Sequence, residues 1–156
     1  MPGRIVTPRT ALAFLAALLF ALPYGAAAHD IPNDVTVQAF VKPAGEHLHL
    51  LVRVPLKAIS DMDFPERAGG YLDLARVDAF LSEAATVWIS DAIEVYEGDA
   101  RLPKPRVVAT RVSLPSDRSF SSYDEALAHI RGPKLADSTS VSWNQVLFDV
   151  ERQSGG

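Results

Sequence analysis

Three of the four histidines in this chain have a spacing compatible with a metal site. His47 and His49 are separated by one residue within an alternating segment, so their imidazoles would share one face of a β-strand. His29 follows three alanines, and cleavage after Ala28 would place its imidazole beside a free α-amine. Because Cu(II) and Ni(II) accept such nitrogen donors, the pattern predicts a metal site of His29, His47 and His49. The alternative is that His47 and His49 are incidental residues on the exposed side of a sheet.

The other polar residues give weaker indications of chemistry. Asp61 and Asp63 lack the loop pattern of calcium sites, so solvated loop acids are the simpler interpretation. Residues 116–119 (SDRS) have no G-x-S-x-G setting and no supporting histidine, and they are typical of a polar turn. His129 is expected in the last turn of a short helix, where its positive charge complements the helix dipole. The sequence has no P-loop, dinucleotide fingerprint or H-E-x-x-H motif, so we expect no enzymatic activity, no catalytic residue and no bound cofactor.

The first 28 residues have the order of a secretory signal peptide. Arg4 and Arg9 precede an uncharged apolar run at residues 11–22, and residues 26–28 are three alanines. A run of 12 apolar residues is shorter than the roughly 20 that a membrane-spanning helix needs. We therefore expect export to the periplasm or to the extracytoplasmic face of the membrane, with an uncleaved N-terminal anchor as the alternative.

The composition of the remaining 128 residues excludes several classes of protein. With 13 basic and 19 acidic residues, they carry a formal charge of −6, which disfavours nucleic acid as a partner. The chain has no cysteine, so disulfides, thiolate metal sites and a lipid anchor on cysteine are excluded. An exported domain of this kind must be stabilised by core packing, for which 128 residues suffice.

A β-hairpin is predicted at the start of the mature chain. Residues 34–42 and 47–54 both alternate between apolar and polar side chains, and a turn is expected at residues 43–46. Pairing Lys42 with His47 brings each apolar residue of one segment opposite an apolar residue of the other. The predicted hairpin therefore has one apolar face and one exposed polar face.

The rest of the chain predicts one long helix, one short helix and further strands. Residues 74–91 carry apolar side chains three and four positions apart, a stripe that includes Trp88. Ser122 and Glu125 form a capping box that begins a helix of about two turns, which ends before Gly132. Further strands are expected at residues 93–96, 106–114 and 141–150.

These elements indicate an α+β fold with an antiparallel sheet, for which a sandwich is the alternative architecture. The expected organisation is a helical signal peptide at residues 1–28, a single extracytoplasmic domain at 29–151 and a disordered tail at 152–156.

Four stretches that cover nearly all of the mature chain resemble a known family. They are HDIPNDVTVQAFVKPAGEHLHLLVRVPL (29–56), WISDAIEVYEG (88–98), RVVATRVSLPSDRSFSSYDEALAHIRGP (106–133) and SWNQVLFDVE (142–151). Together they are similar to the extracytoplasmic N-terminal domain of HupE/UreJ-like bacterial membrane proteins. The resemblance implies an exported, non-enzymatic domain that precedes several transmembrane helices in longer members.

The resemblance provides context rather than chemistry. The HupE/UreJ name is linked to nickel supply for hydrogenase and urease, but the histidine motifs tied to metal passage lie in the membrane part, so no site residue is carried over. In the family the domain continues beyond the last strand, whereas only ERQSGG follows Val150 here. The chain therefore looks like a shortened member, in which residues 141–150 would form an unpaired edge strand. The expected partner is a membrane protein or the missing membrane domain; the alternative function is a periplasmic Cu or Ni module that uses the mature N-terminal histidine.

Overall fold

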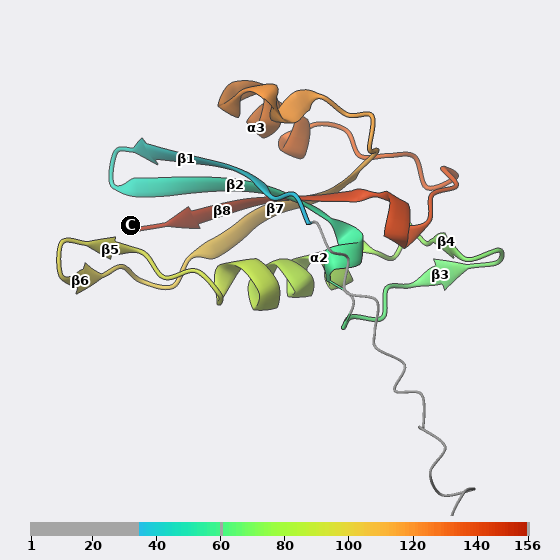
Figure 1. Cartoon of the computed structure of the whole chain (residues 1–156), viewed down its shortest axis with the longest axis horizontal. Coiled ribbons are helices and arrows are strands. Elements are labelled where there is room, and N and C mark those ends of the chain that lie inside the picture. Colours follow the sequence, from blue (N-terminus) through green and yellow to red (C-terminus); the bar gives the residue numbers. More distant parts are fainter. Residues whose placement is uncertain (1–34, 60, 156) are drawn as a thin grey trace, which may run out of the picture. The chain divides into compact units, whose positions relative to one another are not determined.

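A four-stranded antiparallel sheet forms the centre of the computed structural model, which describes residues 35–59 and 61–155. Its strands have the spatial order β1–β2–β8–β7 (Figure 1). They are β1 (Gln38–Ala44), β2 (His47–Pro55), β8 (Leu147–Ser154) and β7 (Arg106–Ser113). The last strand of the chain thus lies between β2 and β7 and directs side chains to both faces of the sheet.

The position of β8 corrects the predictions for the C-terminal region. The expected strand at residues 141–150 begins only at Leu147, because a 3₁₀-helix, η4 (Trp143–Gln145), precedes it. Residues 152–154, expected in a disordered tail, belong to β8. The backbone of β8 pairs with β2 on one side and with β7 on the other, so the expected unpaired edge is not formed at this strand.

The predicted N-terminal hairpin is present, but its register differs from the expected one by two residues. Lys42 lies opposite His49 rather than His47, because only Gly45 and Glu46 form the turn. Gly45 has φ +61°, as the first position of a tight two-residue turn often requires. A shift of two residues keeps every side chain on its expected face, so Val41 still lies opposite an apolar residue, Leu50.

Helices cover both faces of the sheet, which corrects the expectation of one exposed polar face. Figure 1 shows α3 (Tyr123–Arg131) on one side and α2 (Asp78–Ala84) on the other. We call these the α3 side and the α2 side. The main core on the α2 side includes Leu50, Val52, Val54, Leu81, Val112, Phe148 and Val150. A smaller core on the α3 side consists of Leu51, Phe120, Ala126 and Ile130.

The long helix predicted at residues 74–91 is shorter and changes its geometry. α2 continues into a π-helical segment, η2 (Ala85–Ser90), in which the Asp91 amide donates to the Thr86 carbonyl at 2.8 Å. A π-helix has more residues per turn than an α-helix, so the buried stripe moves to Ile89. Trp88, expected in the core, is therefore 41% exposed.

Short elements complete the α+β fold predicted from the sequence. They are the hairpins β3 (Glu66–Arg67) with β4 (Tyr71–Leu72) and β5 (Tyr96–Glu97) with β6 (Ala100–Arg101), and the 3₁₀-helices η1 (Leu56–Ala58) and η3 (Ser119–Ser121). The Ser122 hydroxyl accepts from the Glu125 amide at the start of α3, as predicted. None of the helices within the described residues is long and apolar enough to cross a bilayer. The predicted signal peptide lies outside the described residues.

Candidate functional site

A cluster of buried charged and polar side chains lies between the sheet and α3. Its centre is the ion pair of Arg53 on β2 with Asp149 on β8, which face each other across the ladder. The guanidinium donates through Nε to Oδ1 and through Nη2 to Oδ2, both at 2.7 Å. Asp149 is fully buried and Arg53 nearly so. A bidentate pair of this kind is geometrically specific and neutralises both charges inside the protein.

Asp117 extends the cluster from the loop that follows β7. Its Oδ1 accepts from Arg53 Nη2 at 2.8 Å and from the Ser119 amide at 2.9 Å. Burial alone would raise the pKa of Asp117, but the hydrogen bonds from Ser119 and Arg53 outweigh it and lower the pKa to about 2. Asp117 is thus held as a carboxylate that orders the loop before α3.

Ser113, His129 and Asp117 together form a serine–histidine–carboxylate arrangement that the sequence did not reveal. Ser113 Oγ lies 2.8 Å from His129 Nε2, and His129 Nδ1 lies 3.4 Å from Asp117 Oδ2. Ser113 Oγ also donates its single proton to Asp149 Oδ2 at 2.6 Å. His129 Nε2 is therefore the donor toward Ser113.

This polarity is the reverse of that in a nucleophilic triad, where the histidine accepts the serine proton. Ser113 is only 1% exposed, so its hydroxyl lies out of contact with solvent. The pKa of His129 is lowered, first by burial and second by the positive charge of Arg111, while Asp117 and Asp149 act in the opposite direction. The three side chains connect β7, α3 and the intervening loop, through a hydrogen bond between Ser113 and His129 and a charged contact between His129 and Asp117.

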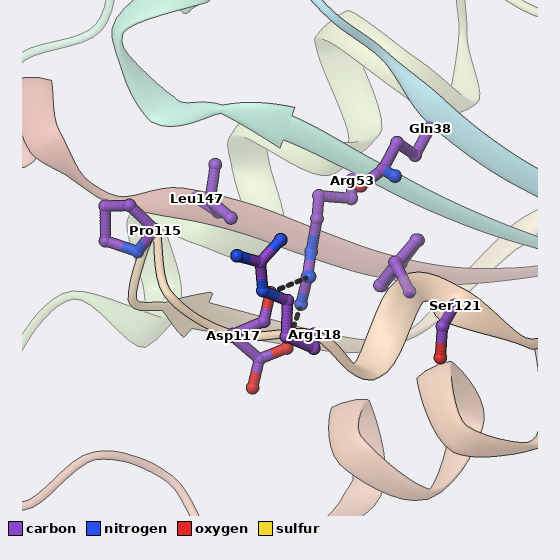
Figure 2. Close-up of a pocket in the computed structure, with 8 residues that line it drawn as sticks. Gln38, Arg53, Pro115, Asp117, Arg118, Ser121 and Leu147 are labelled. Carbon is purple, nitrogen blue, oxygen red and sulfur yellow. Dashed lines mark hydrogen bonds and ion pairs between the residues drawn. The ribbon is translucent and has the colours of Figure 1, made fainter.

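A cavity of about 300 Å³ opens beside this cluster (Figure 2). It is lined by Gln38, Arg53, Pro115, Asp117, Arg118, Phe120, Ser121 and Leu147. The Arg53 guanidinium lies 4.2 Å from the Phe120 ring centre, a cation–π contact. Ser113 and His129 are not among the lining residues, so the cavity does not lead to the serine hydroxyl.

A second ion pair lies on the same side of the sheet, farther along β8. Glu151 is fully buried and accepts two hydrogen bonds from Arg131 of α3, one of them from Nε at 2.7 Å. His49 Nδ1 lies 3.8 Å from Glu151 Oε1, beyond hydrogen-bond distance. The salt bridge between Arg131 and Glu151 attaches the end of α3 to the sheet.

The structure describes two of the three predicted metal ligands. His47 Nδ1 lies 2.9 Å from the Gly155 carbonyl oxygen and therefore donates to it. His49 is partly buried beside Glu151 rather than on an exposed face. His29 lies outside the described residues, so the three-histidine site stays a prediction. Within residues 35–59 and 61–155, no three His, Cys, Asp or Glu side chains are grouped to hold a metal ion.

The buried cluster was not predicted from the sequence, because its residues follow the same alternation as solvent-exposed ones. In FDVERQS, Asp149 and Glu151 alternate with apolar Val150, which is typical of a strand with one wet face. One feature of the sequence could have indicated the cluster. The capped helix at residues 123–131 has apolar positions that must pack against a surface, and the second face of the sheet provides one. No family model matches the chain, and neither the curated proteins nor the solved structures that were searched give a match.

Proposed function

We propose that this chain is an exported, non-enzymatic domain, corresponding in longer relatives to the extracytoplasmic part of a HupE/UreJ-like, transport-related multi-span membrane protein. The observation that carries the non-enzymatic part is the direction of the hydrogen bonds in the buried cluster. Ser113, the one serine bonded to a histidine within residues 35–59 and 61–155, donates its proton to Asp149 and is closed to solvent. The Ser113 hydroxyl and the carboxylates of Asp149 and Glu151 are thus occupied by hydrogen bonds that stabilise the fold.

The export part of the proposal is supported by the order of residues 1–28. It is tested by fusing the full chain to a β-lactamase that lacks its own leader, with a fusion that starts at residue 29 as the control. We expect ampicillin resistance from the full-chain fusion alone. The mass of the purified chain should correspond to cleavage after Ala28. Equal resistance from both fusions, or no resistance from either, contradicts export by this segment.

The non-enzymatic part is tested with chromogenic esters and peptides of several chain lengths. We expect the same background hydrolysis for the wild type and for Ser113→Ala. The matched control is Ser116→Ala, a serine on the exposed loop before Asp117. Turnover by the wild type and by Ser116→Ala that is lost in Ser113→Ala would show that Ser113 is a nucleophile and would overturn the proposal.

A second candidate function, a Cu or Ni module, is favoured by the orientation of His47. Because its Nδ1 donates to the Gly155 carbonyl, its Nε2 carries the free lone pair that a metal ion needs. The test is calorimetric titration of the exported chain with Cu(II) and Ni(II). We expect binding that is lost both in His29→Ala and when one alanine is added before His29, since the added residue moves the α-amine away. Unchanged binding in both variants excludes an N-terminal site.

A further inference from the structure

We propose that Arg152 forms a binding site for a single monatomic anion, such as chloride, beneath the β5–β6 hairpin. Arg152 lies on β8 and points to the α2 side, the face of the main apolar core. It is 1% exposed and is the largest fully buried side chain of the described residues. A guanidinium keeps its charge at any physiological pH, so a full positive charge is enclosed here.

Within residues 35–59 and 61–155, no carboxylate pairs with this charge. The one hydrogen bond that Arg152 donates runs from Nη2 to the carbonyl oxygen of Ile93, at 2.7 Å. Its Nε is buried and has no partner. Burial lowers the pKa of Arg152, and no carboxylate acts to restore it.

The other arginines close to the sheet have the negative counter-charge that Arg152 lacks among the described residues. Arg53 and Arg131 each have a direct ion pair, with Asp149 and Glu151 respectively. Arg111 has no direct pair, but Asp149 and Asp117 stabilise its charge through space. Arg152 alone of these four has neither kind of support from the described residues. A buried charge without a counter-ion is strongly unfavourable, so an external anion gains a large interaction by binding there.

A small cavity beside Arg152 has the size and charge for such an ion. Its volume is about 20 Å³, which is enough for one water molecule or one monatomic ion and too small for a phosphate. The cavity is also lined by Asp91 and Glu94, but each of these acids pairs with another base, at 3.2 Å with Lys104 and at 2.7 Å with Arg101. The charge of the lining therefore totals +1.

The local backbone explains why the cavity is there. The π-helical segment η2 ends at Ser90, and the chain then turns into the β5–β6 hairpin next to the C-terminal end of β8 (Figure 1). The Ser90 hydroxyl donates to the Pro105 carbonyl at 3.3 Å and holds together the two ends of the hairpin segment. An anion on Arg152 would join this segment to the sheet, so binding should stabilise the fold.

The experiment uses protein exported from the full chain and measures ³⁵Cl NMR line width. We expect excess broadening in the wild type, its reversal by added iodide, and its loss in Arg152→Gln. Arg118→Gln, which removes an exposed arginine, is the matched control and should broaden as the wild type does. Equal line widths in the wild type and Arg152→Gln would show that the cavity holds only water and would overturn the proposal.

A second measurement decides the question even if Arg152→Gln does not fold. The wild type is unfolded by urea in sodium chloride and in sodium gluconate at the same ionic strength. Above its Kd, each tenfold increase in chloride should raise the folding equilibrium constant about tenfold, while gluconate, too large for the cavity, should have no such effect. Identical stability in the two salts contradicts an anion site at Arg152.

Discussion

The two faces of strand β8 carry buried charges, but they neutralise them in different ways. On the α3 side, Asp149 and Glu151 are each fully buried and each bonded to an arginine. On the α2 side, Arg152 is just as buried, and its one hydrogen bond within the described residues goes to a backbone carbonyl. On the α3 side, the counter-charges come from α3 and from strand β2. On the α2 side, the proposed counter-charge is an anion bound from solution.

Alternation of polar and apolar residues along a strand therefore does not by itself distinguish a solvent-exposed face from a buried one. Strand β8 is buried on both faces, yet only the α2 side has the apolar composition expected of a core. The α3 side is closed by α3, whose Arg131 pairs with Glu151. Asp149 pairs with Arg53 of the neighbouring strand β2. Charged residues on β8 therefore indicate a polar interior rather than a surface.

The largest effect is expected from breaking the central ion pair of the α3 side. Asp149→Ala leaves Arg53 buried without its main partner and should lower the free energy of unfolding by about 3–5 kcal/mol. This change in the free energy of unfolding is measured by urea denaturation, monitored by circular dichroism. The matched control is Asp124→Ala, which removes the exposed pair with Lys42 and should cost less than about 1 kcal/mol. Similar losses in the two variants would mean that burial adds nothing to this pair.

The second effect tests how the π-helix sets the core of the α2 side. Ile89→Ala should destabilise the protein by about 2–5 kcal/mol, because Ile89 is buried in the main core. Trp88→Ala removes a larger side chain but should change the stability by only about 0.5 kcal/mol, because Trp88 is exposed. An α-helix with the stripe predicted from the sequence gives the opposite order, so thermal denaturation of both variants distinguishes the two geometries.

Most helices and strands could be predicted from the sequence, but which strands pair with one another could not. The hairpin, the strand that became β7 and the capped helix α3 follow from local alternation and from Ser122. The pairing of β8 with β2 joins residues about a hundred positions apart, and its pairing with β7 joins residues 34 to 47 positions apart, for which no local pattern exists. The contact between Ser113 and His129 was not predicted either, because a loop, η3 and most of α3 lie between these two residues in the sequence. His29 remains a sequence-based candidate.

The third effect is acid destabilisation through Asp117. Its pKa falls from 3.8 in the unfolded chain to about 2 in the folded state, so its contribution is complete above pH 4 and disappears as the pH falls toward 2. The shift corresponds to about 2 kcal/mol. Asp117→Asn should therefore remove that part of the acid dependence of the free energy of unfolding, measured by urea titration at pH 4, 3 and 2. If the stability of Asp117→Asn fell as steeply between pH 4 and pH 2 as that of the wild type, other carboxylates would be responsible for the acid dependence.

The smallest effect concerns His129, whose pKa is lowered by burial and by Arg111 against the opposing effect of two carboxylates. Burial and Arg111 lower the pKa of this residue, so the folded state binds a proton less readily than the unfolded chain does. Stability should consequently decline as the pH falls below the unfolded value of about 6.5, until the folded pKa is passed. His129→Gln keeps a donor toward Ser113 without titrating, and it should flatten the stability between pH 7 and 5. His47→Gln is the matched control and should retain the decline. A wild type that gains stability over this range would show that Asp117 and Asp149 outweigh burial and Arg111 at this histidine.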